Sequence, residues 1–99
     1  MLVINKTVEN AEAVFKLEGR LDTASAPSLE KELVSSLDGV RSLILDFEKV
    51  EYVSSAGLRV LLLAMKLLHN KGKMKLVHVN ELVGEVFEVT GFADLLTIE

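Results

Sequence analysis

The sequence predicts an α/β fold, built on a mixed, mostly parallel sheet of about five strands with three or more helices. Two observations predict it. After two opening strand-like segments, apolar runs typical of strands alternate with longer amphipathic segments typical of helices. Such alternation implies βαβ crossovers, which join parallel strands. The two opening segments instead indicate a hairpin, which makes one edge of the sheet antiparallel.

The composition limits the possible partners and chemistry. The 99 residues include no cysteine and carry a formal net charge of −4. This length is typical of one domain with a single core, so we expect one domain spanning residues 1–99. The lack of cysteine excludes disulfides and cysteine-based zinc sites. The negative charge argues against nucleic acid as the main partner, because neutralising phosphates requires a basic surface.

No segment of the sequence predicts a membrane partner. The most apolar segment, residues 58–68, contains Arg59 and Lys66 and is too short to span a bilayer. The first residues lack a charged start followed by an apolar core of signal-peptide length. We therefore expect a soluble, cytoplasmic protein.

The first elements are a hairpin and a helix. Residues 2–8 and 13–18 are strand-like, and residues 8–12 supply a hairpin loop. Ser25 is suited to cap the following helix, and Pro27 to its first turn. The helix carries one apolar stripe that repeats every four residues, namely Leu29, Leu33 and Leu37.

A central strand and the longest helix follow. Residues 43–45 form a short, continuous apolar run typical of a central strand, and Asp46 ends it. Residues 47–53 are expected to form a loop. Residues 55–70 then give the longest helical pattern in the chain.

The last part of the chain predicts a strand, a helix and an edge strand. Residues 74–79 are strand-like, Asn80 can cap a helix over residues 81–90, and Gly91 is suited to end it. Residues 95–98 are expected to form a last edge strand.

Two segments that follow strands are expected to lie together. In mostly parallel sheets, binding sites gather at the carboxyl ends of the strands. Residues 19–22 and residues 46–55 each come just after a strand. The sequence therefore predicts that both contribute to one rim of the sheet.

The sequence lacks the groups needed for catalysis at this rim. A nucleophilic serine needs a base beside it, but His69 lies near a helix end and His78 inside a strand, with no route to Ser55. The chain has no G-x-S-x-G elbow and no phosphate loop of the Walker type. Asp22 and Asp46 alone are too few to hold a metal. We expect no catalytic residue, no metal and no cofactor, and a serine hydrolase is a weak alternative.

Residues 53–59, V-S-S-A-G-L-R, place two hydroxyls side by side at the start of the longest helix. One interpretation is purely structural, because serine is a common helix cap. The other is a phosphoacceptor, because a phosphate at a helix N-terminus faces free N–H groups and the positive end of the dipole. The small Ala56 and Gly57 would keep such a hydroxyl accessible. The local pattern leaves both interpretations open.

Four segments carry a resemblance to a known family. They are residues 17–22 (L-E-G-R-L-D), 43–47 (L-I-L-D-F), 53–58 (V-S-S-A-G-L) and 89–92 (V-T-G-F). No segment is specific alone. In this order and spacing, essentially the whole chain resembles the STAS-domain family of bacterial anti-sigma factor antagonists.

The resemblance implies a mechanism. In that family the unmodified antagonist binds a cytosolic anti-sigma factor that is also an ATP-dependent serine kinase, and this frees the sigma factor. The kinase phosphorylates a serine at the start of a helix, the modified antagonist dissociates, and a PP2C-type phosphatase restores it. The acceptor falls on Ser55 in this chain. Ser54, which stands where the family commonly has aspartate, is then the helix cap.

The resemblance also implies partner contacts at the rim. Asp22 matches a family aspartate associated with the nucleotide side of the kinase, although an aspartate after a strand also forms turns. The expected partner-binding residues are Asp22, Ser54, Ala56, Gly57 and Arg59. The alternative on the same fold is a STAS subunit that is not phosphorylated and belongs to a lipid-transport or signalling-scaffold complex, because fold does not fix function.

Overall fold

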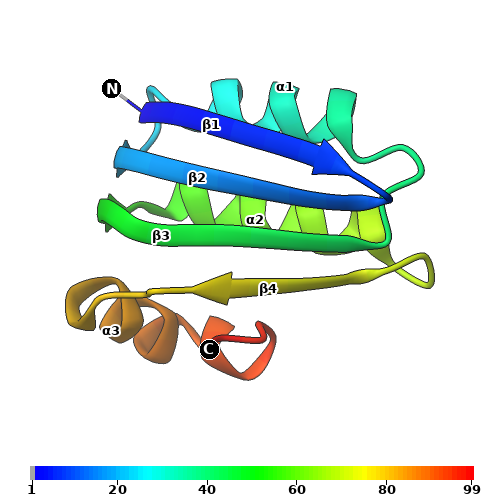
Figure 1. Cartoon of the computed structure of the whole chain (residues 1–99). Helices are drawn as coiled ribbons and strands as arrows, with labels where there is room; N and C mark the ends of the chain where they lie inside the picture. The colour runs from blue at the N-terminus through cyan, green and yellow to red at the C-terminus, as the bar shows by residue number, and fades with distance from the viewer. Residues whose placement is uncertain (1) are drawn as a thin grey trace.

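The computed structural model describes residues 2–99 and shows a sheet covered on one face by two helices (Figure 1). In chain order the elements are β1 (Leu2–Glu9), β2 (Glu12–Leu21), α1 (Ala26–Ser36), β3 (Ser42–Val53), α2 (Ser55–Leu68), β4 (Lys73–Val77), α3 (Glu81–Thr90) and the short 3₁₀ helix η1 (Phe92–Asp94). The strands lie in the order β1-β2-β3-β4, with β1 antiparallel to β2 and the other pairs parallel. The predicted α/β fold with a mixed, mostly parallel sheet is confirmed.

A two-residue turn joins β1 and β2. Asn10 and Ala11 have φ values of 50° and 66°, and two successive positive values define the type I′ turn, whose twist matches that of paired strands. The turn sets the register of the hairpin, in which Glu9 pairs with Glu12 at the turn and Leu2 pairs with Gly19 at the far end. Because side chains alternate along a strand, this register turns one face of the hairpin toward the helices.

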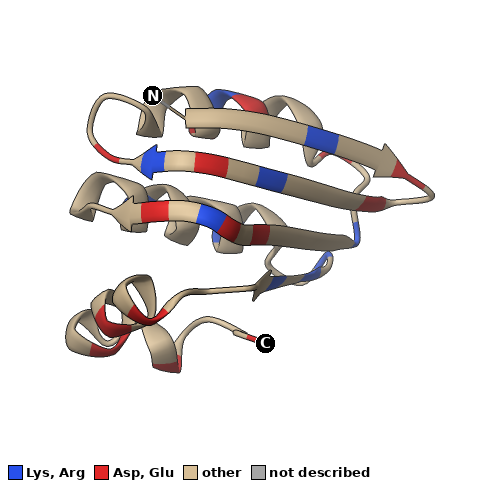
Figure 2. Cartoon of the chain, turned by 60° about the vertical axis from the view of Figure 1, so that its left-hand side comes forward, with Lys and Arg blue, Asp and Glu red and all other residues tan. Residues whose placement is uncertain are grey.

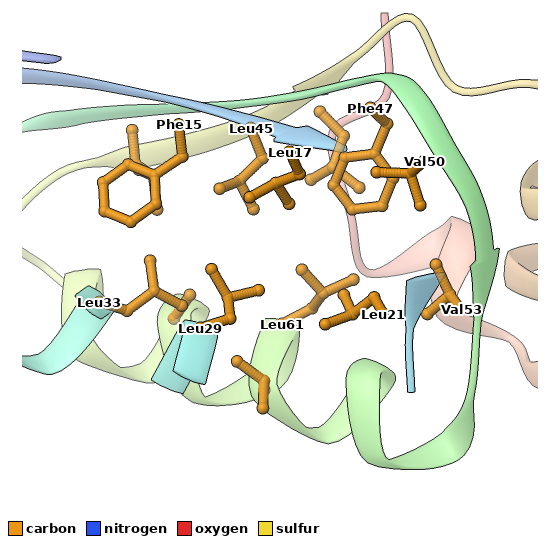
Figure 3. Close-up of a cluster of buried hydrophobic side chains, with 14 of the residues drawn as sticks. Phe15, Leu17, Leu21, Leu29, Leu33, Leu45, Phe47, Val50, Val53 and Leu61 are labelled. Carbon is orange, nitrogen blue, oxygen red and sulfur yellow. The ribbon is translucent and has the colours of Figure 1, made fainter. Parts of the chain in front are cut away.

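The core lies between the sheet and the two covering helices (Figure 3). Phe15 and Leu45 of the sheet point toward Leu29 and Leu33 of α1 and Leu61 of α2, and all five side chains are fully buried. The predicted apolar stripe of α1 is confirmed. Burial of each such side chain contributes roughly 1.5–3 kcal/mol, so the core fixes the helices firmly against the sheet.

Helix α3 packs beside β3 and beyond β4 (Figure 1). Phe87 of α3 lies against Phe47 of β3, with ring centroids 6.2 Å apart and planes tilted by 58°. Asn80 caps the helix, because its side chain accepts from the Val83 N–H at 2.8 Å. Gly91 ends it with a φ of 81°. The predictions for both ends of this helix are confirmed.

Strand β3 is longer than the sequence indicated. The prediction of a strand limited to residues 43–45 and a loop over residues 47–53 is wrong, because the latter segment belongs to β3 and its Val50 is buried. Glu48 and Lys49 are both exposed where the pairing with β2 shifts register. A register shift of this kind breaks the alternation from which a strand is predicted.

The C-terminal part of the sheet also differs from expectation. β4 ends one residue before His78, which was expected inside a strand but lies in a bend with a φ of 58°. Residues 95–98, expected as an edge strand, make only an isolated parallel bridge to Leu76. The sheet formed by residues 2–99 therefore has four strands rather than about five. Leu96 turns inward and is buried, and this bend prevents a longer pairing.

Candidate functional site

The ends of β2 and β3 meet the first turn of α2 at one end of the sheet. The Ser54 N–H donates to the Leu21 carbonyl at 2.9 Å, and Leu21 pairs in register with Val53. We call this surface the α2 rim and define it as residues 20–25 and 52–59. The rim predicted for residues 19–22 and 46–55 is confirmed only for the ends of the two segments, because residues 46–51 lie within β3.

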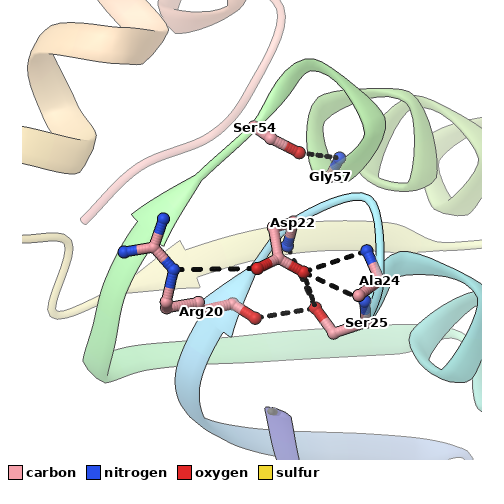
Figure 4. Close-up of polar contacts among 6 residues, drawn as sticks. All are labelled: Arg20, Asp22, Ala24, Ser25, Ser54 and Gly57. Carbon is pink, nitrogen blue, oxygen red and sulfur yellow. Dashed lines mark hydrogen bonds and ion pairs between the residues drawn. The ribbon is translucent and has the colours of Figure 1, made fainter.

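Ser54 and Ser55 have different environments at the start of α2. Ser54 is extended, with φ −92° and ψ 176°, and its Oγ accepts from the Gly57 N–H at 3.3 Å (Figure 4). The prediction that Ser54 caps the helix is confirmed. Ser55 is the first helical residue and is exposed. The backbone N–H groups of Ser55 and Ala56 lie in the first turn of α2. N–H groups in the first turn of a helix have no carbonyl acceptor within the helix.

Gly57 lets α2 approach the end of β2 closely. A Cβ atom at this position would lie 2.7 Å from Leu21 Cγ, 2.9 Å from the Leu21 carbonyl oxygen and 3.1 Å from Val53 Cγ1. Gly57 is buried, whereas Ala56 is half-buried. Gly57 therefore fixes the position of the first turn of α2 through packing, and it offers no side chain to a partner.

Asp22 is held within its own turn (Figure 4). Its Oδ1 accepts from the backbone N–H groups of Ala24 and Ser25, both at 3.1 Å. The hydrogen bond from the Ser25 N–H is the main reason why the pKa of Asp22 lies below its usual range. Asp22 is therefore ionised at neutral pH and forms the turn after β2. A contact with a partner stays a prediction for this residue.

Ser25 does not cap α1 through its side chain, contrary to the sequence-based expectation. It has helical backbone angles and makes no side-chain cap bond. Its hydroxyl donates to the Arg20 carbonyl at 2.7 Å and accepts from the Asp22 N–H at 3.0 Å. Ser25 therefore closes the turn between β2 and α1.

Arg20 and Tyr52 belong to the α2 rim and were missed in the sequence. The Arg20 guanidinium lies 4.6 Å from the centroid of the Tyr52 ring, and its Nε lies 3.6 Å from Asp22 Oδ2. Arg20 of β2 pairs with Tyr52 of β3. Their contact could therefore be predicted only if the register of the two strands were known. This contact adds an oriented cation beside the Asp22 carboxylate.

Asp46 lies outside the α2 rim. It was expected to end a strand, but it sits within β3, with its Oδ1 3.0 Å from His78 Nδ1. Partial burial raises the pKa of Asp46, but hydrogen bonds from the Glu48 N–H and from His78 outweigh this effect and hold the pKa below its usual range. The hydrogen bond to Asp46 raises the pKa of His78. Asp22 and Asp46 therefore do not form one site.

Arg59 belongs to the α2 rim, whereas the two histidines lie away from Ser55. Arg59 is exposed on α2, one turn after Ser55. His69 lies at the opposite end of α2, and His78 contacts Asp46, so neither histidine lies beside Ser55. In the part of the chain that the structure describes, no three His, Asp or Glu side chains gather in a way that could hold a metal ion.

The Asp46–His78 contact predicts a pH-dependent contribution to stability. Because folding raises the pKa of His78, the contribution is fully present below the ordinary histidine pKa of about 6.5 and is lost as the pH rises through the folded-state value. Replacement of His78 by asparagine, which tolerates a positive φ, should therefore lower the urea midpoint more at pH ~6 than at pH ~9. An equal loss at both pH values would contradict this prediction, and His69→Gln serves as the control for the other histidine.

The chain is similar in sequence to known proteins over most of its length. The model that describes the STAS domain matches residues 3–99. The chain belongs to the STAS domain family. BtrV of Bordetella bronchiseptica, assigned by its name to the anti-sigma factor antagonists, is 40% identical over 84 residues, which cover 83% of this chain and 72% of BtrV. The anti-sigma-B factor antagonist of Staphylococcus aureus is 31% identical over 99 residues, which cover 98% of this chain and 92% of that protein.

Solved structures of the same family share this fold. The anti-sigma factor antagonist SpoIIAA in its unphosphorylated form superimposes with a TM-score of 0.84 at 20% identity, over 98% of this chain and 88% of SpoIIAA. The phosphorylated form of Bacillus SpoIIAA gives a TM-score of 0.75 at 20% identity, over 98% of this chain and 91% of SpoIIAA. The STAS resemblance of the sequence is thus confirmed. No helix within residues 2–99 is both long and apolar enough to span a membrane.

Proposed function

We propose that this STAS domain is a cytoplasmic anti-sigma factor antagonist. In its unphosphorylated form it binds an anti-sigma factor that is also a serine kinase, and it thereby releases the sigma factor. Phosphorylation at Ser55 ends this binding, and a PP2C-type phosphatase reverses the modification. The names of the relatives and the unphosphorylated and phosphorylated structures of SpoIIAA support the proposal.

The observation that carries the proposal is the division of roles between the two serines. The Ser54 hydroxyl is engaged in the helix cap, whereas the Ser55 hydroxyl is exposed at the first helical position. A phosphate on Ser55 would meet the positive end of the α2 dipole and two backbone N–H groups of the first turn. The helix can therefore accept the modification and stay folded.

The proposed partner surface is the α2 rim. Ser55 in the first turn of α2 and Arg59 one turn later are exposed, and Ala56 next to Ser55 is half-buried. Asp22 lies on the adjoining loop, where its turn keeps the carboxylate ionised. A kinase that docks here meets the acceptor hydroxyl together with the Asp22 carboxylate and the guanidinium groups of Arg20 and Arg59.

The test uses the anti-sigma factor that the chain is proposed to bind, together with its sigma factor. Added to a preformed complex of the two without nucleotide, the unphosphorylated chain should release the sigma factor, as measured by size-exclusion chromatography. If the chain binds neither protein and instead co-purifies with a transporter or a scaffold, the proposed function is wrong.

The chain is proposed to act by binding and not by catalysis. Among the described residues, neither serine hydroxyl forms a hydrogen bond with a His, Asp or Glu side chain, and a nucleophilic serine requires such a base. We expect the purified protein to show no ester hydrolysis above background. Hydrolysis that disappears in Ser55→Ala would contradict this expectation.

A further inference from the structure

A groove lies at the opposite end of α2 from Ser55. It has a volume of about 760 Å³ and runs between the C-terminal part of α2, β4 and the segment after η1. Its apolar lining includes Met65 and Leu68 of α2, Met74 of β4, and Leu95 of the C-terminal segment. A smaller hollow beside Met65 continues along α2. We call the larger one the β4 groove.

The outer edge of β4 is only partly paired in this groove. The Leu76 N–H donates to the Thr97 carbonyl at 2.8 Å, and the Leu76 carbonyl accepts from the Glu99 N–H at 2.8 Å. Backbone groups two residues apart in a strand point to the same side, so those of Met74 also point outward. Within residues 2–99 they have no backbone partner on that side. An unpaired strand edge is a template for another extended segment.

Lysines lie on β4 beside the groove (Figure 2). Lys73 and Lys75 line it together with Glu99, and Lys66 lines the adjoining hollow. Lys75 pairs with Glu99 at 3.3 Å, but Lys66 and Lys73 are exposed and form no ion pair among the described residues. The charge of the groove is therefore complementary to an acidic segment.

A second copy of this chain is a poor occupant of the edge. Antiparallel pairing of two β4 edges centred on Met74 would set Lys73 of one copy opposite Lys75 of the other, and like charges directly opposite destabilise a sheet. The unpaired edge thus favours a different protein.

We propose that the β4 groove binds an extended acidic segment of a partner protein, which adds a short strand beside Met74. One backbone N–H and one carbonyl of the segment pair with Met74, and its carboxylates lie near Lys73. An aliphatic side chain packs on Met65, whose thioether adapts readily to different shapes. Because the groove and the α2 rim lie at opposite ends of α2, this partner can bind while the rim is occupied.

The test is an NMR titration of the ¹⁵N-labelled chain with the peptide acetyl-Asp-Val-Glu-Leu-Asp-amide. We expect saturable shifts of the Lys73, Met74 and Lys75 amides, and at saturation an exchange of the Met74 amide hydrogen slowed by about tenfold or more. The same peptide with lysine at the three acidic positions should not bind. Lys73→Glu should weaken binding roughly fivefold, because an exposed charge pair contributes modestly.

Two results would overturn the proposal. One is the absence of saturable shifts in the groove up to about 5 mM peptide, about five times a dissociation constant of ~1 mM. The other is binding without slower exchange at Met74, which would show that no strand is added. If decanoate shifts the same amides and the peptide does not, the groove is a site for small anionic amphiphiles and the peptide proposal is wrong.

Discussion

Phosphorylation of Ser55 is expected to weaken binding to the anti-sigma factor by more than ~100-fold while leaving the fold intact. A phosphoserine adds between one and two negative charges at neutral pH. The free N–H groups and the dipole of α2 stabilise part of that charge within the chain. A docked partner must instead desolvate it, and the ionised Asp22 on the same rim adds repulsion. A loss of ~3 kcal/mol at the interface gives the stated change in affinity.

Affinity and melting temperature of the two forms test this expectation together. Ser55→Asp should reproduce the loss of binding only in part, because aspartate carries less charge and has a different shape. Ser55→Ala is the matched control and should bind at nearly the affinity of the unmodified chain. If the phosphorylated form unfolds, the switch acts through conformation. If it binds as tightly as the unmodified form, the electrostatic account is wrong.

Gly57→Ala is expected to destabilise the protein by about 1–3 kcal/mol, the usual cost of inserting a methyl group where there is no room. The new Cβ would approach the Leu21 side chain and carbonyl to 2.7 and 2.9 Å, and a backbone carbonyl cannot move aside alone. The first turn of α2 must therefore shift, and Ser54 and Ser55 shift with it.

Gly84→Ala in α3 is the control for Gly57→Ala. A Cβ at Gly84 meets only Val79 Cγ1 at 3.8 Å, an ordinary contact. Replacing a helical glycine by alanine without a clash should stabilise the protein by about 0.5–1 kcal/mol. Urea unfolding of both variants measures the two changes in the free energy of unfolding. Equal stabilisation by the two substitutions would show that α2 has room to move at the rim.

The elements with strong local signals could be predicted from the sequence. The stripe of leucines in α1, the Asn80 and Gly91 ends of α3 and the Ser54 cap all depend on residues a few positions apart. The second half of β3 was missed because Glu48 and Lys49 interrupt its alternation. Local pattern therefore located the start of α2 more reliably than the end of the preceding strand.

Contacts at the rim that depend on register could not be predicted. Arg20 meets Tyr52 only because β2 and β3 pair as they do. Ser25 has a residue type favoured at helix starts, but its hydroxyl bonds to the Arg20 carbonyl instead. Asp46 stands in a family segment like Asp22, yet it faces His78.

The most direct measurement for the central claim is the mapping of the phosphate after incubation with the cognate kinase and ATP. Because Ser55 is exposed and Ser54 caps the helix, we expect the two single alanine variants to differ in whether they accept a phosphate. Ser54→Ala should still accept one phosphate, although loss of the cap should lower stability by about 1 kcal/mol. Ser55→Ala should accept none. Mass spectrometry that finds the phosphate on Ser55 supports the account, and a phosphate on Ser54, or on neither serine with an active kinase, contradicts it.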